Sequence, residues 1–370
     1  MLSRFFIPLA IVVFILSCRE KRTPQQVLDQ ARTMMANREG IQHRSTYHWE
    51  NALNEMDTFQ YDIQLVRHQN DYFDFNYITQ GANSDVVYIN NDLKIINHSD
   101  STVENFLPNQ LEDNKDRICK TMALAFNPVL LLQQKEWSYA KDTIVKGTIF
   151  HDFYLVQMDT TIGEKEIYLE RHLFINPATK TPGFFSNRLY HNGSRSQVIH
   201  AYFSGYDFQA PNEALAYLPP SNYVSKSSQD KKTEKRIMLK AGDVAPDFEL
   251  PTLDGQTIKL SDMKGQKVLL DFSMINCGWC GIALDNFNKP GFTFKSNIKP
   301  IYLNPVDTKE DMKKYAAIKN IDFPVVPEAK AVGKAYGVSG YPSFFLIDEK
   351  GIIEKAFAGF DKETILEFSH

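Results

Sequence analysis

The spacing of apolar residues changes along the chain, and each spacing predicts a helix or a strand. A helix is predicted after Thr23, because Thr23 suits an N-cap, Pro24 the first helical position and Gln26 a capping box. Apolar residues then recur at helical spacing, at Val27, Leu28, Ala31, Met34 and Met35. These residues therefore predict one amphipathic helix that begins after Thr23.

From residue 59 onward, apolar residues recur at every second position, which is the period of a strand with one buried face. Residues 59–65 show this alternation, and further strand-like runs follow at 73–77, 86–89, 93–96, 153–158, 167–175 and 198–203. A more continuous apolar segment, 122–132, predicts a helix that Pro128 interrupts. Many short strands of this kind predict an antiparallel sheet with one face covered.

A polar and charged stretch, residues 221–236, follows these strands. It contains few apolar residues and predicts a linker rather than a packed element. The length of 370 residues agrees with two domains. We therefore predict a separate α+β, antiparallel-sheet-rich domain at 23–220 and a second domain at 237–370.

In the second domain, the apolar run 268–272 leads to Cys277-Gly278-Trp279-Cys280, where a strand is expected to hand over to a helix. Unpaired N–H groups and the positive end of the helix dipole stabilise a thiolate at such a position. The thiolate is the form that attacks disulfides. The pattern predicts a thiol–disulfide exchange site with Cys277 as nucleophile and Cys280 as the resolving cysteine.

A zinc site and a structural disulfide are the alternatives to a redox-active cysteine pair. Zinc needs four ligands, and the chain has no second cysteine pair and only His370 as a histidine after Cys280. A structural disulfide across so short a loop is strained and easily reduced, which fits redox chemistry better than stapling. We therefore predict no metal ligands and no bound cofactor.

Asp271 interrupts the apolar run before the pair. A carboxylate in a buried strand is costly, because burial disfavours its charge and raises its pKa. One interpretation makes Asp271 the group that accepts the proton of the second cysteine. The other makes it a strand-end residue bonded to nearby backbone, and the spacing alone does not choose between them.

Three segments in order resemble the thioredoxin superfamily, and in particular its TlpA-like redoxin group. They are the entry segment Gly242–Leu250, the strand before the Cys-x-x-Cys, and the Gly-Tyr-Pro-Ser segment that runs to Asp348 before a glycine turn. The resemblance covers the chain from about residue 239. It implies an α/β thioredoxin-like fold, with a central mixed sheet flanked by helices.

The resemblance also assigns roles to residues near the pair. It implies that Pro342 is a cis-proline packed opposite Cys277–Cys280, and that the backbone of Tyr341 pairs with a substrate segment. Trp279, between the cysteines, is expected to contact the substrate too. Asp271 matches the buried acid of thioredoxin itself.

The chain departs from the family pattern in ways that bear on reduction potential and partner choice. Asn276 stands where a tryptophan often precedes the first cysteine, Gly-Trp replaces Gly-Pro between the cysteines, and the following helix lacks a kinking proline. A peroxiredoxin is disfavoured, because its threonine and proline are missing before both Cys277 and Cys280.

The N-terminus predicts the compartment. Arg4 precedes an apolar run, 5–16, that is too short to span a bilayer and fits a signal-peptide core. The run leads to Cys18 and resembles a bacterial lipoprotein signal, which implies removal of residues 1–17 and a lipid on Cys18. The alternatives are an uncleaved anchor and an ordinary signal peptide. We predict a lipid-anchored protein of the bacterial cell envelope that faces the periplasm.

Elsewhere the composition adds little chemistry. The net charge is −4, with 41 basic and 45 acidic residues, and no basic stripe indicates nucleic acid as a partner. Cys119 has apolar neighbours and is expected to be a buried, inert cysteine, with pairing to Cys277 as the alternative. The aromatic residues of the first domain fit core packing, or an open half-barrel that holds a lipid or peptide. That plan weakly resembles periplasmic lipoprotein carriers.

These features predict an extracytoplasmic, membrane-tethered thiol–disulfide oxidoreductase. Its expected partners are client proteins with disulfides, a membrane electron donor and the membrane that holds its lipid anchor. The direction of exchange depends on the reduction potential, and the resemblance together with Asp271 favours reduction of the client. The alternative is a ligand-binding or scaffold lipoprotein whose thioredoxin-like domain is accessory.

Overall fold

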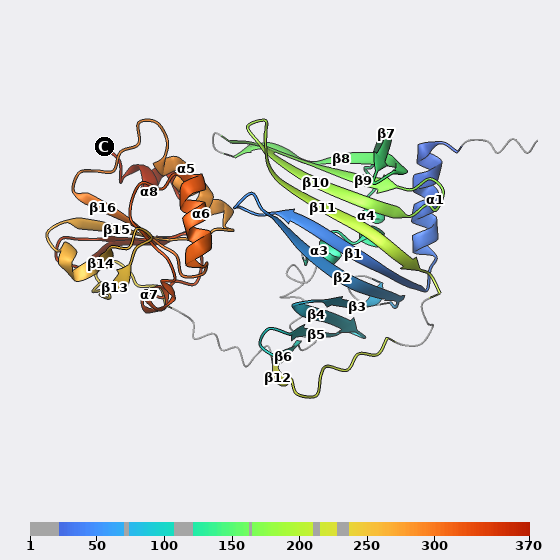
Figure 1. Cartoon of the computed structure of the whole chain (residues 1–370), viewed down its shortest axis with the longest axis horizontal. Coiled ribbons are helices and arrows are strands. Elements are labelled where there is room, and N and C mark those ends of the chain that lie inside the picture. The colour runs from blue at the N-terminus through green and yellow to red at the C-terminus, as the bar shows by residue number, and fades with distance from the viewer. Residues whose placement is uncertain (1–21, 70–73, 107–120, 163–164, 210–214, 228–236) are drawn as a thin grey trace, which may run out of the picture.

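The computed structural model describes residues 22–69, 74–106, 121–162, 165–209, 215–227 and 237–370. Its strands gather into a large sheet towards one end of an elongated molecule and a five-stranded sheet towards the other (Figure 1). The large sheet holds the earlier part of the chain, and the smaller sheet holds the C-terminal third.

The large sheet has twelve strands in the order β12-β6-β5-β4-β3-β2-β1-β11-β10-β9-β8-β7. Their bounds are β1 (Gly40–Glu50), β2 (Met56–Arg67), β3 (Phe75–Gly81), β4 (Ser84–Ile89), β5 (Asp92–Asn97), β6 (Thr102–Phe106), β7 (Ser138–Val145), β8 (Thr148–Ile162), β9 (Lys165–Ile175), β10 (Pro182–His191), β11 (Ser194–Asp207) and β12 (Val224–Ser227). All neighbouring pairs are antiparallel except β12 and β6. The predicted antiparallel-sheet-rich region is confirmed.

One face of this sheet packs against α1 (Pro24–Ala36), α3 (Met122–Ala125) and α4 (Pro128–Gln133). Alternate strand residues point to this face and join apolar residues of the helices in one core. Pro128 begins α4 instead of interrupting a single helix, because proline suits the first helical position.

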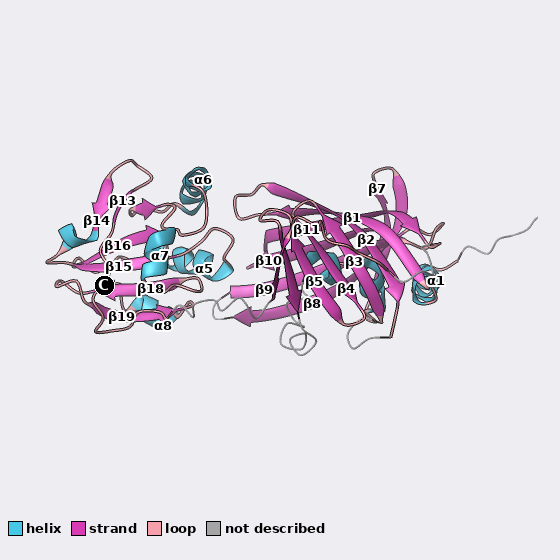
Figure 2. Cartoon of the chain, turned by 90° about the horizontal axis from the view of Figure 1, so that it is seen from below, coloured by secondary structure: helices cyan, strands magenta, loops and turns pink. Residues whose placement is uncertain are grey.

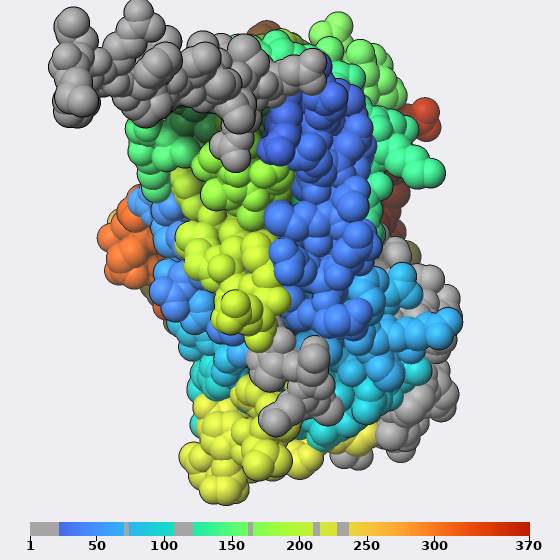
Figure 3. Space-filling model, turned by 90° about the vertical axis from the view of Figure 1, so that its right-hand side faces the viewer, coloured from blue at the N-terminus to red at the C-terminus, as the bar shows by residue number. Residues whose placement is uncertain are grey.

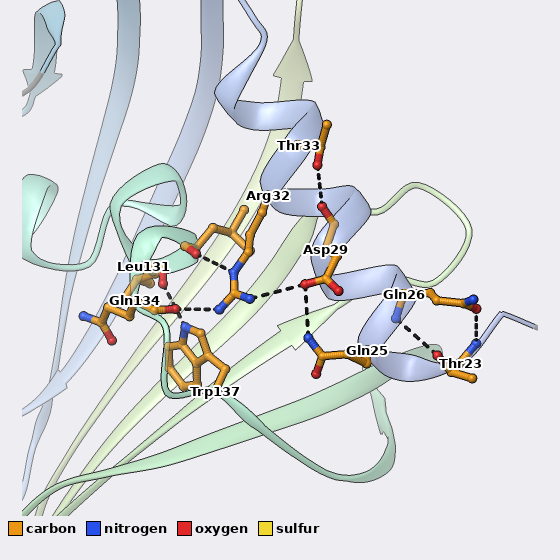
Figure 4. Close-up of polar contacts among 10 residues, drawn as sticks. Thr23, Gln25, Gln26, Asp29, Arg32, Thr33, Leu131, Gln134 and Trp137 are labelled. Atoms are coloured by element: carbon orange, nitrogen blue, oxygen red, sulfur yellow. Dashed lines mark hydrogen bonds and ion pairs between the residues drawn. The ribbon is translucent and has the colours of Figure 1, made fainter.

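Helix α1 begins at its predicted cap. The Thr23 hydroxyl accepts a hydrogen bond from the Gln26 N–H, and the Gln26 side chain accepts one from the Thr23 N–H (Figure 4). Arg32 donates from its guanidinium to the backbone oxygens of Leu132 and Gln134, which fastens α1 to the end of α4. In Figure 3 the blue surface of α1 runs beside the yellow-green surface of β11 at this end of the molecule.

Strand β12 lies within residues 221–236, for which the sequence predicts a linker. Residues 224–227 pair with β6 in parallel, and the Asn105 side chain donates to the Ser225 hydroxyl at 2.8 Å. A polar sequence can form such a strand because an edge strand needs backbone partners more than it needs apolar side chains. Residues 228–236 lie outside the described residues.

The smaller sheet has the order β17-β16-β15-β18-β19, with β15 parallel to β16 and antiparallel to β18. Its strands are β15 (Lys267–Phe272), β16 (Ile298–Leu303), β17 (Val325–Val326), β18 (Ser343–Ile347) and β19 (Ile353–Ala358), preceded by the hairpin β13 (Glu249–Pro251) and β14 (Thr257–Lys259). The helices are α5 (Gly278–Phe287), α6 (Lys309–Lys319), α7 (Lys330–Ala335) and α8 (Lys362–Leu366), with a 3₁₀ turn at Leu260–Met263. This is the mixed sheet with flanking helices that the family resemblance implied.

The two faces of the smaller sheet carry separate apolar clusters. Residues of α7 and of the β13–β14 hairpin pack on one face. Residues of α5, α6 and α8 pack on the other face. Seen from below, α5 lies on the side of the smaller sheet that is turned towards the large sheet (Figure 2).

Candidate functional site

The two predicted cysteines lie between β15 and α5. Cys277 is the N-cap of α5, and its Sγ accepts a hydrogen bond from the Cys280 N–H at 3.1 Å. The two side chains are joined by a disulfide. The chain therefore changes from strand to helix where the sequence predicted it. This change places backbone N–H groups and the positive end of the helix dipole beside the Cys277 sulfur.

The two sulfurs differ in exposure. Cys277 is half-buried at the surface, whereas Cys280 is 0% exposed. An incoming disulfide can therefore reach Cys277 but not Cys280. Cys280 lies next to Cys277 on the first turn of α5. Its sulfur can therefore attack a mixed disulfide that forms at Cys277.

Asp271 is buried in β15, with 2% of its surface exposed. The Ser273 hydroxyl donates a hydrogen bond to Oδ1 at 2.5 Å, and Oδ2 has no hydrogen-bond partner among the described residues. Burial raises the pKa of Asp271 to about 7, and the Ser273 hydrogen bond opposes part of that rise. The carboxyl group therefore changes charge near neutral pH.

Asp271 shares its face of the sheet with α5. Leu269, two residues earlier on β15, packs in one apolar cluster with Ala283 and Leu284 of α5, and residues two apart on a strand point to the same face. Tyr302 of β16 is in register with Asp271, and burial, followed by the negative charge of Asp271, raises the pKa of Tyr302 well above its usual value. The carboxyl group thus lies in the layer between the central strand and the helix that carries both cysteines.

Tyr341 and Pro342 precede β18, the strand next to β15. The peptide bond between them is cis, as the resemblance implied. Ser343 pairs with Phe272 at the end of β15. Pro342, the residue before Ser343, therefore lies beside the start of the connection that leads from β15 to Cys277. Tyr341 packs, partly buried, against the apolar cluster on the α7 side.

Trp279 lies between the cysteines and is 52% exposed. Its ring stacks on Phe360, with 6.2 Å between centroids and 13° between planes. Phe360 follows β19, so residues from two distant parts of the sequence form one aromatic surface beside the disulfide.

Asp307 was not predicted, although it holds the connection between β15 and α5. Its Oδ2 accepts a hydrogen bond from the Ile275 N–H at 2.8 Å and another from the Asn304 side chain at 2.9 Å. Asn304 directly follows β16, the parallel neighbour of β15. Polar residues directly after a parallel strand are the sequence signal that could have found this pair, because such ends meet at one edge of a sheet.

Asn276 brings the large sheet to the site, a contact that no pattern in the sequence predicts. Its Oδ1 accepts a hydrogen bond from the backbone N–H of Ala52, in the turn between β1 and β2. Beside this contact lies a cleft of about 900 Å³ that includes Cys277 in its lining. The two contacting residues are 224 positions apart in the chain, so no local pattern could pair them.

Two of the predicted residues, Cys18 and Cys119, lie outside the described residues, as does the predicted signal peptide. Within the described ranges, no helix has the length and apolar character needed to cross a bilayer. The same ranges hold no cluster of three or more His, Cys, Asp or Glu side chains that could bind a metal ion.

The C-terminal third of the chain is similar to proteins that carry family names. A family model described as the AhpC/TSA family matches residues 241–356. The thioredoxin-like protein YneN of Bacillus subtilis is 29% identical over 130 residues, which are 34% of this chain and 76% of that protein. The thiol-disulfide oxidoreductase ResA of Geobacillus thermodenitrificans is 32% identical over 130 residues, 34% of this chain and 74% of that protein.

Among solved structures, the crystal structure of StoA from Bacillus subtilis is 26% identical, covers 34% of this chain and 97% of its own, and has a TM-score of 0.29. Each of these matches covers about a third of this chain. The family model places its match in the part that forms the smaller sheet.

Proposed function

Because this chain belongs to the ResA-like thiol-disulfide oxidoreductases of the thioredoxin superfamily, we propose that it reduces disulfides of client proteins outside the cytoplasm while held at a membrane. The observation that carries the proposal is the unequal cysteine pair. Cys277 is accessible at the start of α5, and Cys280 is buried and bonded to it. This arrangement supports one sulfur that captures a client and one that releases it.

The cycle starts from the reduced pair. The Cys277 thiolate attacks a client disulfide, the client S–S bond breaks, and a mixed disulfide forms while one client sulfur leaves as a thiolate. Cys280 then attacks Cys277, and the second client sulfur leaves. Two electrons have passed to the client, and the cysteine pair ends as the disulfide. A membrane electron donor returns the two electrons, so no bound cofactor is needed.

Asp271 supports the second step as a proton acceptor. Cys280 must lose its proton before it attacks, and a carboxylate with a pKa of about 7 can take that proton near neutral pH. The unpartnered Oδ2 leaves one oxygen of the carboxyl group available. Pro342 and the Tyr341 backbone, at the same end of the sheet, are proposed to border the bound client, and Trp279 to contact it.

Location and organisation extend the same proposal. Residues 1–17 act as a lipoprotein signal, Cys18 carries the lipid, and the chain faces the periplasm of the bacterial cell envelope. The large sheet and the smaller sheet, each with its own apolar core, act as two domains.

The test uses the full chain, reduced beforehand, with insulin as the disulfide probe. In Cys280→Ser the mixed disulfide cannot be resolved, so a covalent adduct with insulin should accumulate on non-reducing gels and disappear with dithiothreitol. In Cys277→Ser no adduct should form, and insulin reduction should fall to background. Cys119→Ser is the matched control and should behave like the natural chain. Absence of an adduct in Cys280→Ser, together with full activity in Cys277→Ser, would reject the assigned roles.

A further inference from the structure

We propose that the edge of the large sheet forms one wall of a client-binding cleft at Cys277, and that the cleft accepts an extended, apolar, cysteine-bearing segment of the client polypeptide. This inference rests on the proposed reductase function. It gives the large sheet the role of selecting clients, while the cysteine pair performs the exchange.

The β1–β2 turn is anchored beside the site by contacts of three kinds. The Ala52 N–H donates to the side chain of Asn276, the residue before Cys277. Ala52 and Leu53 pack against the apolar cluster that contains residues of α5 and α6. The Glu55 carboxylate forms an ion pair of 2.7 Å with Lys314 of α6. The turn therefore lies at a defined place next to the nucleophile.

The cleft beside this turn is lined from both sides. The large sheet contributes the ends of β1, β2, β10 and β11, among them Trp49, Phe59, Leu189 and Gln197. The opposite wall comes from the connection before α5 and from α5 and α6, among them Cys277, Ile282 and Ile318. Its volume of about 900 Å³ falls near the top of the roughly 300–1,000 Å³ range of ligand clefts, so it has room for several residues of an extended segment.

The chemistry of the walls indicates the kind of segment. The facing apolar side chains of Trp49, Leu189 and Ile318 can bury apolar residues on either side of a client cysteine. The lining holds three acidic residues and one lysine: Glu50, which pairs with Arg195, Asp57, and Asp285, which pairs with Lys319. The acidic excess disfavours an acidic segment, and the apolar side chains of the lining favour an apolar one.

The client must be extended at this point, because the attacked sulfur has to reach a half-buried atom. Cys277 lies in the lining between two walls instead of on a convex surface. Gln197 and Ser196 at the start of β11 provide polar side chains in the same lining for a client backbone. A cysteine held rigidly in a folded client surface would not enter between the walls.

The experiment compares two disulfide-linked peptide dimers with the full-length, pre-reduced chain in single-turnover assays. In one dimer leucines flank the cysteine, and in the other serines flank it. Each peptide rate is divided by the rate with 2-hydroxyethyl disulfide, a small neutral disulfide that reports the reactivity of Cys277. We expect the leucine-flanked dimer to react about tenfold faster than the serine-flanked one, as burial of a few methylenes predicts.

Substitutions on the wall of the large sheet should remove this preference. In Trp49→Ala and in Leu189→Ser the ratio should fall to within about twofold. Two variants are used because Trp49 also packs against the core of the large sheet, so its loss alone could disturb folding. Met158→Ala is the matched control, since Met158 is 42% exposed on β8 and outside the cleft lining, and its ratio should equal that of the natural chain.

The outcomes separate the two proposals. If both wall variants keep the preference, or the natural chain shows none, the cleft proposal is overturned. It is equally overturned if both variants accelerate both peptides, because the sheet edge would then be a cap over Cys277. Failure of the natural chain to reduce even 2-hydroxyethyl disulfide would instead reject the proposed reductase function.

Discussion

At the scale of single residues, Asp271 shows how surroundings set chemistry. The sequence places an acid inside an apolar strand, and this much predicts a cost of burial. Burial of the carboxyl group raises its pKa to about 7, and the hydrogen bond from Ser273 opposes part of that rise. The packing of β16, β18 and α5 around β15 produces these surroundings.

A pH prediction follows for Asp271. The proton acceptor must be ionised, so the rate of client release by Cys280 should fall as pH drops through about 7. Asp271→Asn should lose this limb of the profile and react about a hundredfold more slowly at pH 8. The measurement is the single-turnover rate of insulin reduction from pH 5 to 9.

Ser273→Ala provides the control for this assignment. Its hydroxyl donates to the carboxylate and lowers the pKa of Asp271, so its removal should move the midpoint of the rate profile to higher pH. An unchanged midpoint in Ser273→Ala, or an unchanged profile in Asp271→Asn, would contradict the proton-acceptor role.

At the scale of elements, the connection between β15 and α5 depends on a neighbouring connection. Asp307, after β16, accepts hydrogen bonds from the Ile275 N–H and the Asn304 side chain. The start of α5 could be predicted because the strand pattern ends shortly before the cysteines. The bond to Asp307 could not, because it depends on β15 and β16 lying side by side and in parallel.

Removing the Asp307 carboxylate should loosen this connection. Asp307→Ala leaves the Ile275 N–H without its acceptor, which should destabilise the protein by about 1–3 kcal/mol. We also expect slower alkylation of reduced Cys277, because the N-cap position of its sulfur is less well fixed. Urea unfolding and the rate of iodoacetamide labelling measure the two effects. In the control Asp322→Ala, at an exposed position, both should stay close to the values of the natural chain.

At the scale of the whole molecule, the large sheet and the redox site are joined through the β1–β2 turn. Glu55 and Lys314 are each about half exposed, so their ion pair contributes little to stability. Its effect is to orient the turn beside α6. The arrangement matters for function because the cleft at Cys277 exists only while the two sheets keep these relative positions.

A charge swap tests this orientation. Glu55→Lys places two cations together, so the turn at residues 51–55 should exchange its amide hydrogens faster, while the midpoint of global unfolding should stay close to that of the natural chain because the pair is exposed. The double variant Glu55→Lys with Lys314→Glu should restore the original exchange rate. Glu136→Lys, at an exposed position away from the turn, serves as control for the added charge. Equal exchange in the single and double variants would show that the pair does not orient the turn.

Features that depend on residues close together in the chain can be predicted from the amino-acid order. The capping box of α1, the alternating strands, and the Cys-x-x-Cys at the start of a helix all follow from residues a few positions apart. Such patterns reflect local backbone preferences and the periods of helices and strands, and both depend on the order of residues over a few positions.

Features that depend on residues far apart in the chain arise from the packing of the folded molecule. The polar residues 224–227 form a strand because the edge of β6 supplies backbone hydrogen-bond partners for them. Asn276 accepts a hydrogen bond from the Ala52 N–H because the large sheet packs beside α5 and α6. The same packing provides the second wall of the cleft at Cys277. Contacts between residues so far apart are fixed by the packing of whole elements, and no run of neighbouring residues records them.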